Sequence, residues 1–331
     1  MSNKQAVTCE ILILLGLFLV AKIIISNIPI ESLNVDRWSV ITAFWNNFFA
    51  GEFVFFAKSH MGNPPGPMPF YFIISLPFYL LGKIDYLSLL GILVFYFTLT
   101  HQKIEPKIRT TVLLLIIFSP FYIWEIATRS NLFLNSSLIL LGMILFTNIK
   151  DFNKFSNQIF IGVLLGLFIS TRNVFAICYI IMFMYLLKNK QISLLSLFKI
   201  CVIIFLTFVF TFIPFVINFQ NEFLISNPFI VQSDVLIPTY LTVAIIFSSF
   251  FYFYFCRNNF DIFFYSGIIL FATICIHFIY HIILHGFDLA FFGSRADVSY
   301  FIFCIPFFYY FLINSKINFI EKISHYTVLS R

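Results

Sequence analysis

Residues 31–69 read ESLNVDRWSVITAFWNNFFAGEFVFFAKSHMGNPPGPMP and form the longest stretch of the chain without a membrane-spanning segment. The stretch follows a first apolar run and contains what the rest of the chain largely lacks: acids, amides, a histidine and a cluster of prolines and glycines. Asp36 comes shortly after the end of the first run, so we expect it at the boundary between membrane and water. We therefore interpret residues 31–69 as a structured outer surface and not as a slack connector.

An amphipathic helix is expected directly after Asp36. With about 100° between successive residues, apolar and small polar side chains fall on opposite sides of this helix. The apolar side carries Trp38, Ile41, Phe44, Trp45, Phe48 and Phe49, and the polar side carries Ser39, Thr42, Asn46 and Ala50. Such a helix lies in the plane of the interface instead of crossing the membrane. The sequence GNPPGP over residues 62–67 then predicts a rigid, non-helical backbone before the chain re-enters lipid.

The composition excludes a water-soluble fold, because the chain has too little polar surface to cover itself. Of the 331 residues, 61% are apolar and 10% are charged, and the mean hydropathy is +0.98. Apolar runs recur along the whole chain, each near or above the length that crosses ~30 Å of hydrocarbon at about 1.5 Å per residue. The predicted fold class is all-α: a polytopic transmembrane helical protein with a single domain over residues 1–331.

About ten spans are expected, together with the interfacial helix and one short re-entrant helix. The re-entrant helix covers residues 70–82, which are apolar but too short to cross and which contain Pro77. The spans are expected at residues 9–29, 85–100, 110–126, 131–148, 158–171, 174–187, 199–218, 236–256, 261–284 and 296–314.

Most lysines of the short loops fall on one side of the membrane if residues 70–82 do not cross it. By the positive-inside rule this side is the cytoplasm, which places both termini there and residues 30–69 on the outer side. The short loops favour a bacterial inner membrane protein. The net charge of +6 comes without a basic stripe, so no nucleic-acid partner is expected.

Three charged residues are the main candidates for chemistry. Asp36 is a carboxylate at the outer face that could take a proton from an incoming hydroxyl, or it could be the N-cap of the next helix. Arg172 lies at a tight break between two spans, where its planar guanidinium suits a phosphate; the alternative is an arginine that snorkels at a helix end. Arg295 opens the last span on the same side, or it forms a local ion pair with Asp297 or Asp288.

Further polar residues are candidates for lining an outer cavity or binding an acceptor: His60, Asn63, Glu125, Arg129, Asn131, His281 and His285. His277, His281 and His285 follow an i, i+4, i+8 spacing. Because no carboxylate-rich motif accompanies them, this row favours a cavity wall or a polar seam over a metal site. Glu125 and Arg129 could instead pair with each other along a helix. For His60 and Asn63 the alternative is an ordinary loop surface.

Several functional motifs are absent from the sequence. It contains no GxxxxGK[ST], GxGxxG or GxSxG, so nucleoside triphosphate and serine-hydrolase chemistry have no support. The six cysteines include no CxxC pair, which indicates neither a disulfide framework nor a zinc site. A group donor is therefore expected to arrive already activated, dissolved in the bilayer, and no cofactor is expected.

The layout resembles that of the GT-C-fold membrane glycosyltransferases. The matching features are a first span followed by a long outer loop with an early acid, Asp36, and a juxtamembrane helix that ends at Gly51. Four stretches add to the resemblance: NPPGPMPFYF (63–72), SPFYIWEIATRSNLF (119–133), GLFISTRNVFA (166–176) and FIFCIPFF (301–308). The chain departs from the family in having Asn131 where a second acid is often found, and in lacking a large soluble C-terminal domain.

The resemblance implies a reaction and a set of partners. A polyprenyl-phosphate sugar would enter from the outer leaflet, and Asp36 would act as the general base on the acceptor hydroxyl. Attack would invert the anomeric carbon, while Arg172 and Arg295 stabilise the departing phosphate. The acceptor would be a glycan, a lipid or a protein, and the site would be metal-free, with a divalent metal as the lesser alternative.

Two other readings remain open at this point. One is a polymerase or ligase of lipid-linked glycan, or a flippase, with a different fold. A transporter should show paired broken helices or repeat symmetry, which the sequence lacks, and a ligase or polymerase should carry its large outer loop late in the chain. The other is a structural subunit without chemistry, which leaves Arg172 unexplained.

Overall fold

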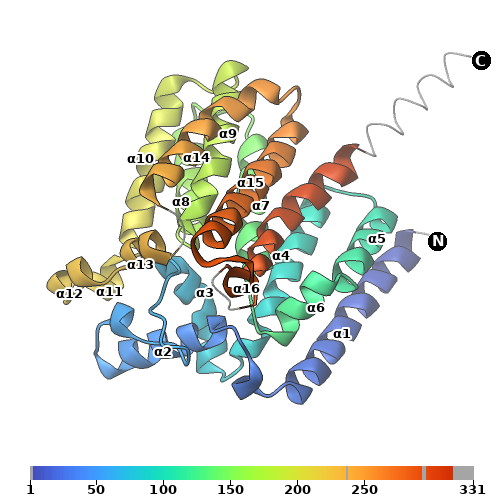
Figure 1. The fold of residues 1–331 in the computed structure, drawn as a ribbon. Helices are drawn as coiled ribbons and strands as arrows, with labels where there is room; N and C mark the ends of the chain where they lie inside the picture. The colour runs from blue at the N-terminus through green and yellow to red at the C-terminus, as the bar shows by residue number, and fades with distance from the viewer. Residues whose placement is uncertain (1–2, 236–237, 293–295, 316–331) are drawn as a thin grey trace, which may run out of the picture.

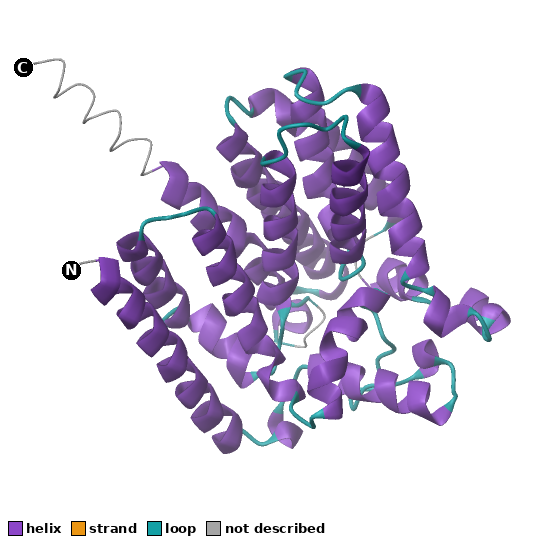
Figure 2. Ribbon diagram, turned by 180° about the vertical axis from the view of Figure 1, so that it is seen from behind, coloured by secondary structure: helices purple, strands orange, loops and turns teal. Residues whose placement is uncertain are grey.

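The computed structural model describes residues 3–235, 238–292 and 296–315, and over these residues it contains helices and no strand (Figures 1 and 2). In chain order the α-helices are α1 (Asn3–Asn27), α2 (Arg37–Ala50), α3 (Pro69–Leu80), α4 (Leu87–His101), α5 (Pro106–Ile117), α6 (Pro120–Ala127), α7 (Leu132–Thr147), α8 (Phe155–Ile169), α9 (Ala176–Lys188), α10 (Leu194–Phe210), α11 (Ile213–Val216), α12 (Gln220–Ile225), α13 (Pro228–Val235), α14 (Thr239–Tyr252), α15 (Asn259–His285) and α16 (Phe287–Phe291). Short 3-10 helices are η1 (Ile30–Ser32), η2 (Val54–Phe56), η3 (Ile84–Tyr86), η4 (Asn173–Phe175), η5 (Phe253–Phe255) and η6 (Val298–Cys304).

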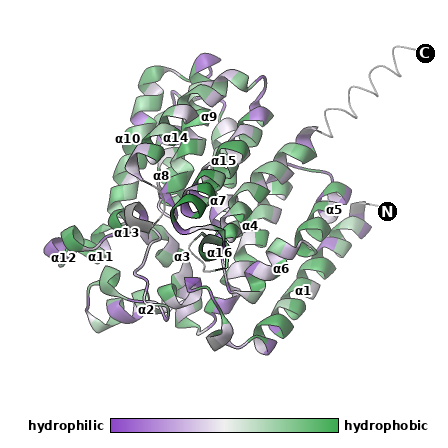
Figure 3. Cartoon of the chain, in the orientation of Figure 1, coloured by the Kyte–Doolittle hydropathy of each residue, from purple (hydrophilic) through white to green (hydrophobic). Residues whose placement is uncertain are grey.

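The protein has the apolar helices of an integral membrane protein. Within the described part, 5 helices are long and apolar enough to cross a membrane: Lys4–Asn27, Ile84–His101, Leu194–Val216, Asn259–His285 and Val298–Ser315. The pair α5 and α6, bent by 60° at Phe118-Ser119, makes up to 6 if it counts as one span. Figure 3 shows hydrophobic residues along the length of α1 and α10, as expected for helices in contact with lipid.

Of the about ten spans expected from the sequence, only the five helices and the bent pair named above are long and apolar enough to cross a membrane. The segments expected at 131–148, 158–171, 174–187 and 236–256 form apolar helices of 10–17 residues. α7, with 16 residues, is about 24 Å long, which is less than the thickness of the hydrocarbon layer. Nearly all of its residues are buried, because α7 packs against α4 on one side and α8 on the other. Hydropathy alone does not distinguish a short apolar helix enclosed by protein from a lipid-facing span.

The loops with the most lysines meet at one end of the helices. A shallow pocket is lined jointly by residues 150–153 and 187–194, and Ser196 Oγ donates to Asn153 Oδ1 at 3.0 Å across these two loops. The Lys188 ammonium lies 5.6 Å from the Phe253 ring, which brings the connection after α14 to the same end. Helices α2, α3 and α13 lie at the opposite end (Figure 1).

Helix α2 forms where the amphipathic pattern predicts it, and Gly51 ends it in a left-handed conformation (φ 74). Its aromatic side does not face lipid as a whole. Phe44 is fully buried and stacks on Phe72 of α3 with ring centroids 3.7 Å apart, whereas Phe49 is 57% exposed. Half of the expected interfacial face is therefore the seam that fastens α2 to α3. The predicted short helix at 70–82 is confirmed as α3, with Pro77 inside it.

Close packing of α8 on α10 sets the position of the break after α8. A Cβ on Gly162 would lie 2.7 Å from Ile203 Cγ2, and one on Gly166 would lie 2.7 Å from the Ile204 carbonyl oxygen. Glycines at such crossings let two helix backbones approach closely in a membrane protein. The end of α8, and with it the residues up to Arg172, is thereby held against α10.

Candidate functional site

A cavity of about 1030 Å³ opens at the end of the protein that carries α2, α3 and α13. Its wall is built from segments that are far apart in the sequence: residues 32–37, 61–67, Tyr71, the start and end of α6, Arg172, α13, the last turns of α15 and residues 296–300. The volume is at the upper end of what small-molecule sites in proteins enclose, roughly 300–1,000 Å³. Polar and apolar groups share the lining, so the cavity suits a ligand with both characters.

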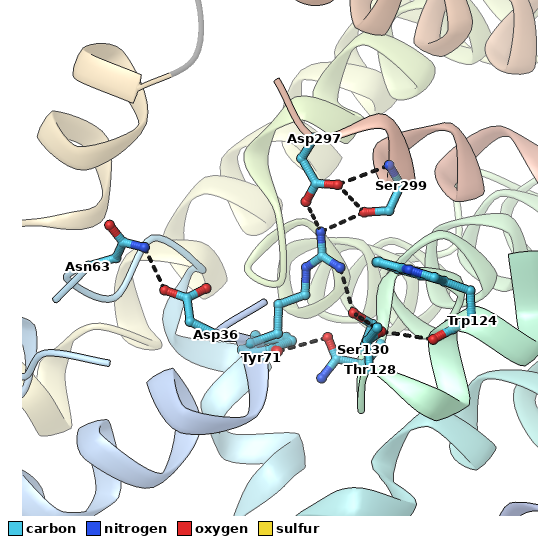
Figure 4. A network of polar contacts seen from close by, with 10 residues as sticks. Asp36, Asn63, Tyr71, Trp124, Thr128, Ser130, Asp297 and Ser299 are labelled. Atoms are coloured by element: carbon cyan, nitrogen blue, oxygen red, sulfur yellow. Dashed lines mark hydrogen bonds and ion pairs between the residues drawn. The ribbon is translucent and has the colours of Figure 1, made fainter. Parts of the chain in front are cut away.

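Asp36 presents its carboxylate to this cavity. Its Oδ2 accepts a hydrogen bond from Asn63 Nδ2 at 2.7 Å (Figure 4) and a second one from Ser59 Oγ, also at 2.7 Å. Asp36 occupies the N-cap position of α2, but its side chain makes no capping bond to any described residue. An ionised carboxylate only accepts hydrogen bonds, and the two donors leave Oδ1 available to a ligand. The side chain thus does not make the capping bond of the alternative interpretation.

The loop that holds Asp36 is itself tightly bonded. Ser59 N donates to Asn63 O at 2.9 Å, and Asn63 N donates back to Ser59 Oγ at 3.1 Å. Gly62 lies between them with a φ of 82, a conformation that residues with a side chain rarely adopt. Gly66 O accepts from Gln232 Nε2 at 2.6 Å, which connects the loop to α13. The proline-glycine cluster has the non-helical backbone that its sequence predicts, and it forms part of the cavity wall.

Arg172 reaches the same cavity from the break between α8 and η4. The start of α3 is fastened to this break, because Met68 N donates to Thr171 O and Tyr71 N to Ser170 O, both at 3.3 Å. The Arg172 guanidinium consequently lies over the Tyr71 ring, 6.0 Å from its centroid. Its Nε is buried without a hydrogen-bond partner, and the part of the chain that the structure describes supplies no ion pair to this arginine. A cation in this position is available to an anionic ligand. An arginine that only snorkels at a helix end would not need to face such a cavity.

A buried ion pair that the sequence analysis did not identify stands beside these two residues. Arg37 is 7% exposed; it pairs with Asp297 and donates to Ser130 Oγ, and its Nη2 lies 2.8 Å from Ser299 Oγ (Figure 4). Its guanidinium also lies 5.7 Å from the Trp124 ring centroid. No local pattern indicates the pair, since its partners are 260 residues apart in the chain; the only signal was an arginine directly after Asp36.

The charges of this pair stabilise each other. Burial is the largest single effect on Arg37 and would lower its pKa, but the Asp297 carboxylate together with Tyr300, Glu125 and Tyr71 outweighs burial and leaves the pKa of Arg37 raised. Burial likewise would raise the pKa of Asp297, yet the Arg37 charge and the hydrogen bonds from Ser299 bring it below its usual value. Both groups are therefore ionised at neutral pH.

Within the described residues, the partner of Asp297 is Arg37. Arg295 itself lies outside the described residues. Its neighbours Ala296 and Asp297 line the cavity. Of the three charged residues expected to converge, Asp36 and Arg172 do so.

Glu125 and Arg129 do not line the cavity, contrary to expectation, and they do not pair with each other. The Glu125 carboxylate is fully buried and accepts the Phe133 N–H at 2.9 Å, so it caps the N-terminus of α7. Arg129 adopts a φ of 55 in the turn between α6 and α7 and binds Asp85 Oδ1 through its Nε at 2.7 Å. Both residues hold helices together behind the cavity wall.

Asn131 and the exposed His60 likewise do not line the cavity. Asn131 is fully buried, and its Oδ1 accepts from the Tyr71 hydroxyl at 2.8 Å, which orients the ring under Arg172. His60 stacks on Trp38, and its Nδ1 is 2.7 Å from Ser39 Oγ. Asn63, by contrast, lies on the cavity wall as expected.

The histidine row of α15 forms part of the cavity wall, which agrees with the interpretation preferred from the sequence. His277, His281 and His285 all line the cavity, with ring centroids 4.6 Å and 5.6 Å apart along the row. Over the described residues, no group of three or more His, Cys, Asp and Glu side chains is placed to hold a metal ion.

The arrangement combines a carboxylate able to accept a proton, an arginine able to bind an anion and a wall of imidazoles around one cavity in an apolar helical protein. Comparison of the chain with models of protein families, with curated proteins and with solved structures finds no match, so the assignment of chemistry rests on this geometry and on the sequence.

Proposed function

We propose that this protein is a membrane glycosyltransferase of the GT-C type that transfers a sugar from a polyprenyl-phosphate donor to an acceptor hydroxyl. The observation that carries the proposal is that Asp36 and Arg172, which come from distant parts of the chain, line one cavity. Transfer from a sugar phosphate needs a base for the acceptor and a positive charge for the leaving phosphate, and these two residues are of the required types.

In the proposed reaction, Asp36 Oδ1 takes the proton of the acceptor hydroxyl as that oxygen attacks the anomeric carbon. The bond between the anomeric carbon and the phosphate oxygen breaks on the opposite face, so the configuration inverts. Arg172 neutralises the charge that develops on the phosphate, which leaves as polyprenyl phosphate. A charge placed in advance in a site of low dielectric constant contributes several-fold more than in water.

The proposal extends to the membrane topology. The cavity opens at the end opposite the loops with Lys150, Lys188 and Lys190. By the positive-inside rule it would then lie on the outer, periplasmic side of a bacterial inner membrane, with both termini in the cytoplasm. The four short apolar helices would then complete about ten crossings, since a wet cavity at one end thins the hydrocarbon that they need to traverse. The lipid donor would reach the cavity from the outer leaflet, and the acceptor would be a glycan, a lipid or a protein.

Substitution Asp36→Asn tests the role of the base. Asparagine keeps an oxygen that Ser59 and Asn63 can donate to, so folding and insertion should be preserved, while transfer from a polyprenyl-phosphate sugar in isolated membranes should fall about 10²–10⁴-fold. Glu52→Gln is the matched control, because Glu52 is an exposed acid of the same outer segment that does not line the cavity. Transfer at the wild-type rate by Asp36→Asn would remove the central claim.

Substitution Arg172→Ala tests the phosphate site separately. Hydrogen bonds to charged groups contribute about 1.5–3 kcal/mol, so inhibition of transfer by added polyprenyl phosphate should weaken roughly 10–100-fold. Arg257→Ala removes an exposed arginine at the opposite end and should leave this inhibition unchanged. Equal inhibition of Arg172→Ala and wild type would assign Arg172 a structural role.

A further inference from the structure

We propose that Arg37 is a positioning residue, whose ion pair with Asp297 holds Asp36 in the cavity by tying the first turn of α2 to the last span. The inference rests on the function proposed for Asp36 and adds to it the device that places the carboxylate.

The bonds of Arg37 join three segments of the chain. The guanidinium starts from the first residue of α2, reaches Ser130 in the turn between α6 and α7, and reaches Asp297 and Ser299 at the start of η6. Asp297 is in turn oriented by the Ser299 N–H, which donates to its Oδ1 at 2.9 Å. Removal of Arg37 would therefore disconnect two opposite parts of the cavity wall, residues 32–37 and residues 296–300.

The other polar contacts of the first turn of α2 run to the loop 59–63: Trp38 stacks on His60, and Ser39 Oγ lies 2.7 Å from the His60 Nδ1. The aromatic residues Phe44 and Trp45, which fasten α2 to α3, come two turns later. The Asp36 side chain is bonded to the loop 59–63. The position of the carboxylate therefore depends on both this loop and the first turn of α2. Because Arg37 is the next residue, its position sets the direction in which Asp36 leaves the backbone.

The site requires an arginine specifically. A guanidinium presents five donors in a planar fork, which lets Arg37 serve an acid and two hydroxyls at once. A lysine at this position would keep the charge opposite Asp297 but could not reach all three acceptors in the same geometry. Arg37→Lys therefore keeps the positive charge but loses the geometry of the three hydrogen bonds, and Arg37→Gln removes the charge.

The test measures transfer from a polyprenyl-phosphate sugar together with the reactivity of the Asp36 carboxyl. In Arg37→Gln, we expect kcat to fall about 10–100-fold, the size of effect that a displacement of about 1 Å produces, with Arg37→Lys intermediate. Inhibition by polyprenyl phosphate should stay within twofold of wild type, since Arg172 is held by other segments. In the Asp36→Asn background, Arg37→Gln should cause no further loss, because a positioning effect disappears with the group that it positions.

Carbodiimide labelling of carboxyls, read by mass spectrometry, gives a measure that does not depend on transfer. Labelling of Asp36 should change at least threefold in Arg37→Gln, whereas labelling of the exposed Glu52 in the same outer segment should not change. If wild type shows no transfer, the proposed function fails and labelling alone decides the role of Arg37. If Arg37→Gln does not insert, Ser299→Ala, which removes a hydroxyl bonded to both members of the pair, takes its place with the same expected direction. Unchanged labelling of Asp36, or a loss of kcat that is fully retained in the Asp36→Asn background, would overturn the proposal.

Discussion

The contact between α4 and α7 offers a direct test of the architecture behind the cavity. A Cβ built on Gly91 of α4 would lie 2.8 Å from Leu134 N and 3.2 Å from Phe133 C. These are backbone atoms of α7, which cannot turn aside as a side chain can, so Gly91→Ala forces the two helices apart. The point of contact is next to the Phe133 N–H that Glu125 caps, so the displacement reaches the start of α7 as well.

The magnitude follows from two opposing effects. Overpacking of a close contact costs about 1–3 kcal/mol, and alanine gains up to about 1 kcal/mol over glycine in helix propensity. We therefore expect Gly91→Ala to lower stability by about 1–2 kcal/mol, which should appear as a fall of a few degrees in Tm of the detergent-solubilised protein.

Gly16→Ala is the matched control, because Gly16 also lies in a membrane-spanning helix and a Cβ there meets nothing within 4 Å. This variant should keep its Tm or gain slightly from helix propensity. A Tm for Gly91→Ala that equals or exceeds that of Gly16→Ala would refute the packing of α4 on α7 described above.

Two further predictions concern α2 and its ion pair. Phe44→Ala removes a fully buried ring from its stack on Phe72 and should cost about 3–5 kcal/mol, measured as a lower Tm; an unchanged Tm would mean that α2 does not pack on α3. For Asp297, the pKa in the folded state lies below the usual 3.8, so its stabilising effect is present above that pH and is lost as the pH falls through the folded-state pKa. The difference in Tm between wild type and Asp297→Asn should therefore be constant from about pH 5 to 7 and shrink below about pH 4. A difference that instead grew in acid would contradict the pairing of Asp297 with Arg37.

The architecture was foreseeable in its class and in its local features. Composition and the length of the apolar runs determine an α-helical membrane protein. In lipid, an apolar run must pair its backbone N–H and C=O groups internally, and a helix does so within a single run. The amphipathic pattern after Asp36 and the glycine at position 51 determine α2 and its end, since both are local properties of the backbone. The number of helices that cross was not fixed by hydropathy, because the run over α7 is as apolar as a span but is short and enclosed by protein.

The composition of the site was foreseeable only in part. Asp36 and Arg172 were identified because an acid and an arginine are conspicuous in an apolar chain, and the structure brings both to one cavity. The same criterion also selected Glu125 and Arg129, which the structure uses to cap α7 and to bind Asp85. Residue type marks a charge as costly to bury but does not tell whether its partner is a ligand or another part of the protein.

The sequence by itself determined that this protein is a bundle of apolar helices with a polar outer segment, since hydropathy and helical periodicity act over neighbouring residues. Only the tertiary structure decided that Arg37 and Asp297, 260 residues apart, form the tie beside Asp36. A pairing over that distance depends on how the helices pack, and packing is settled by the fit of many weak contacts that no local pattern records.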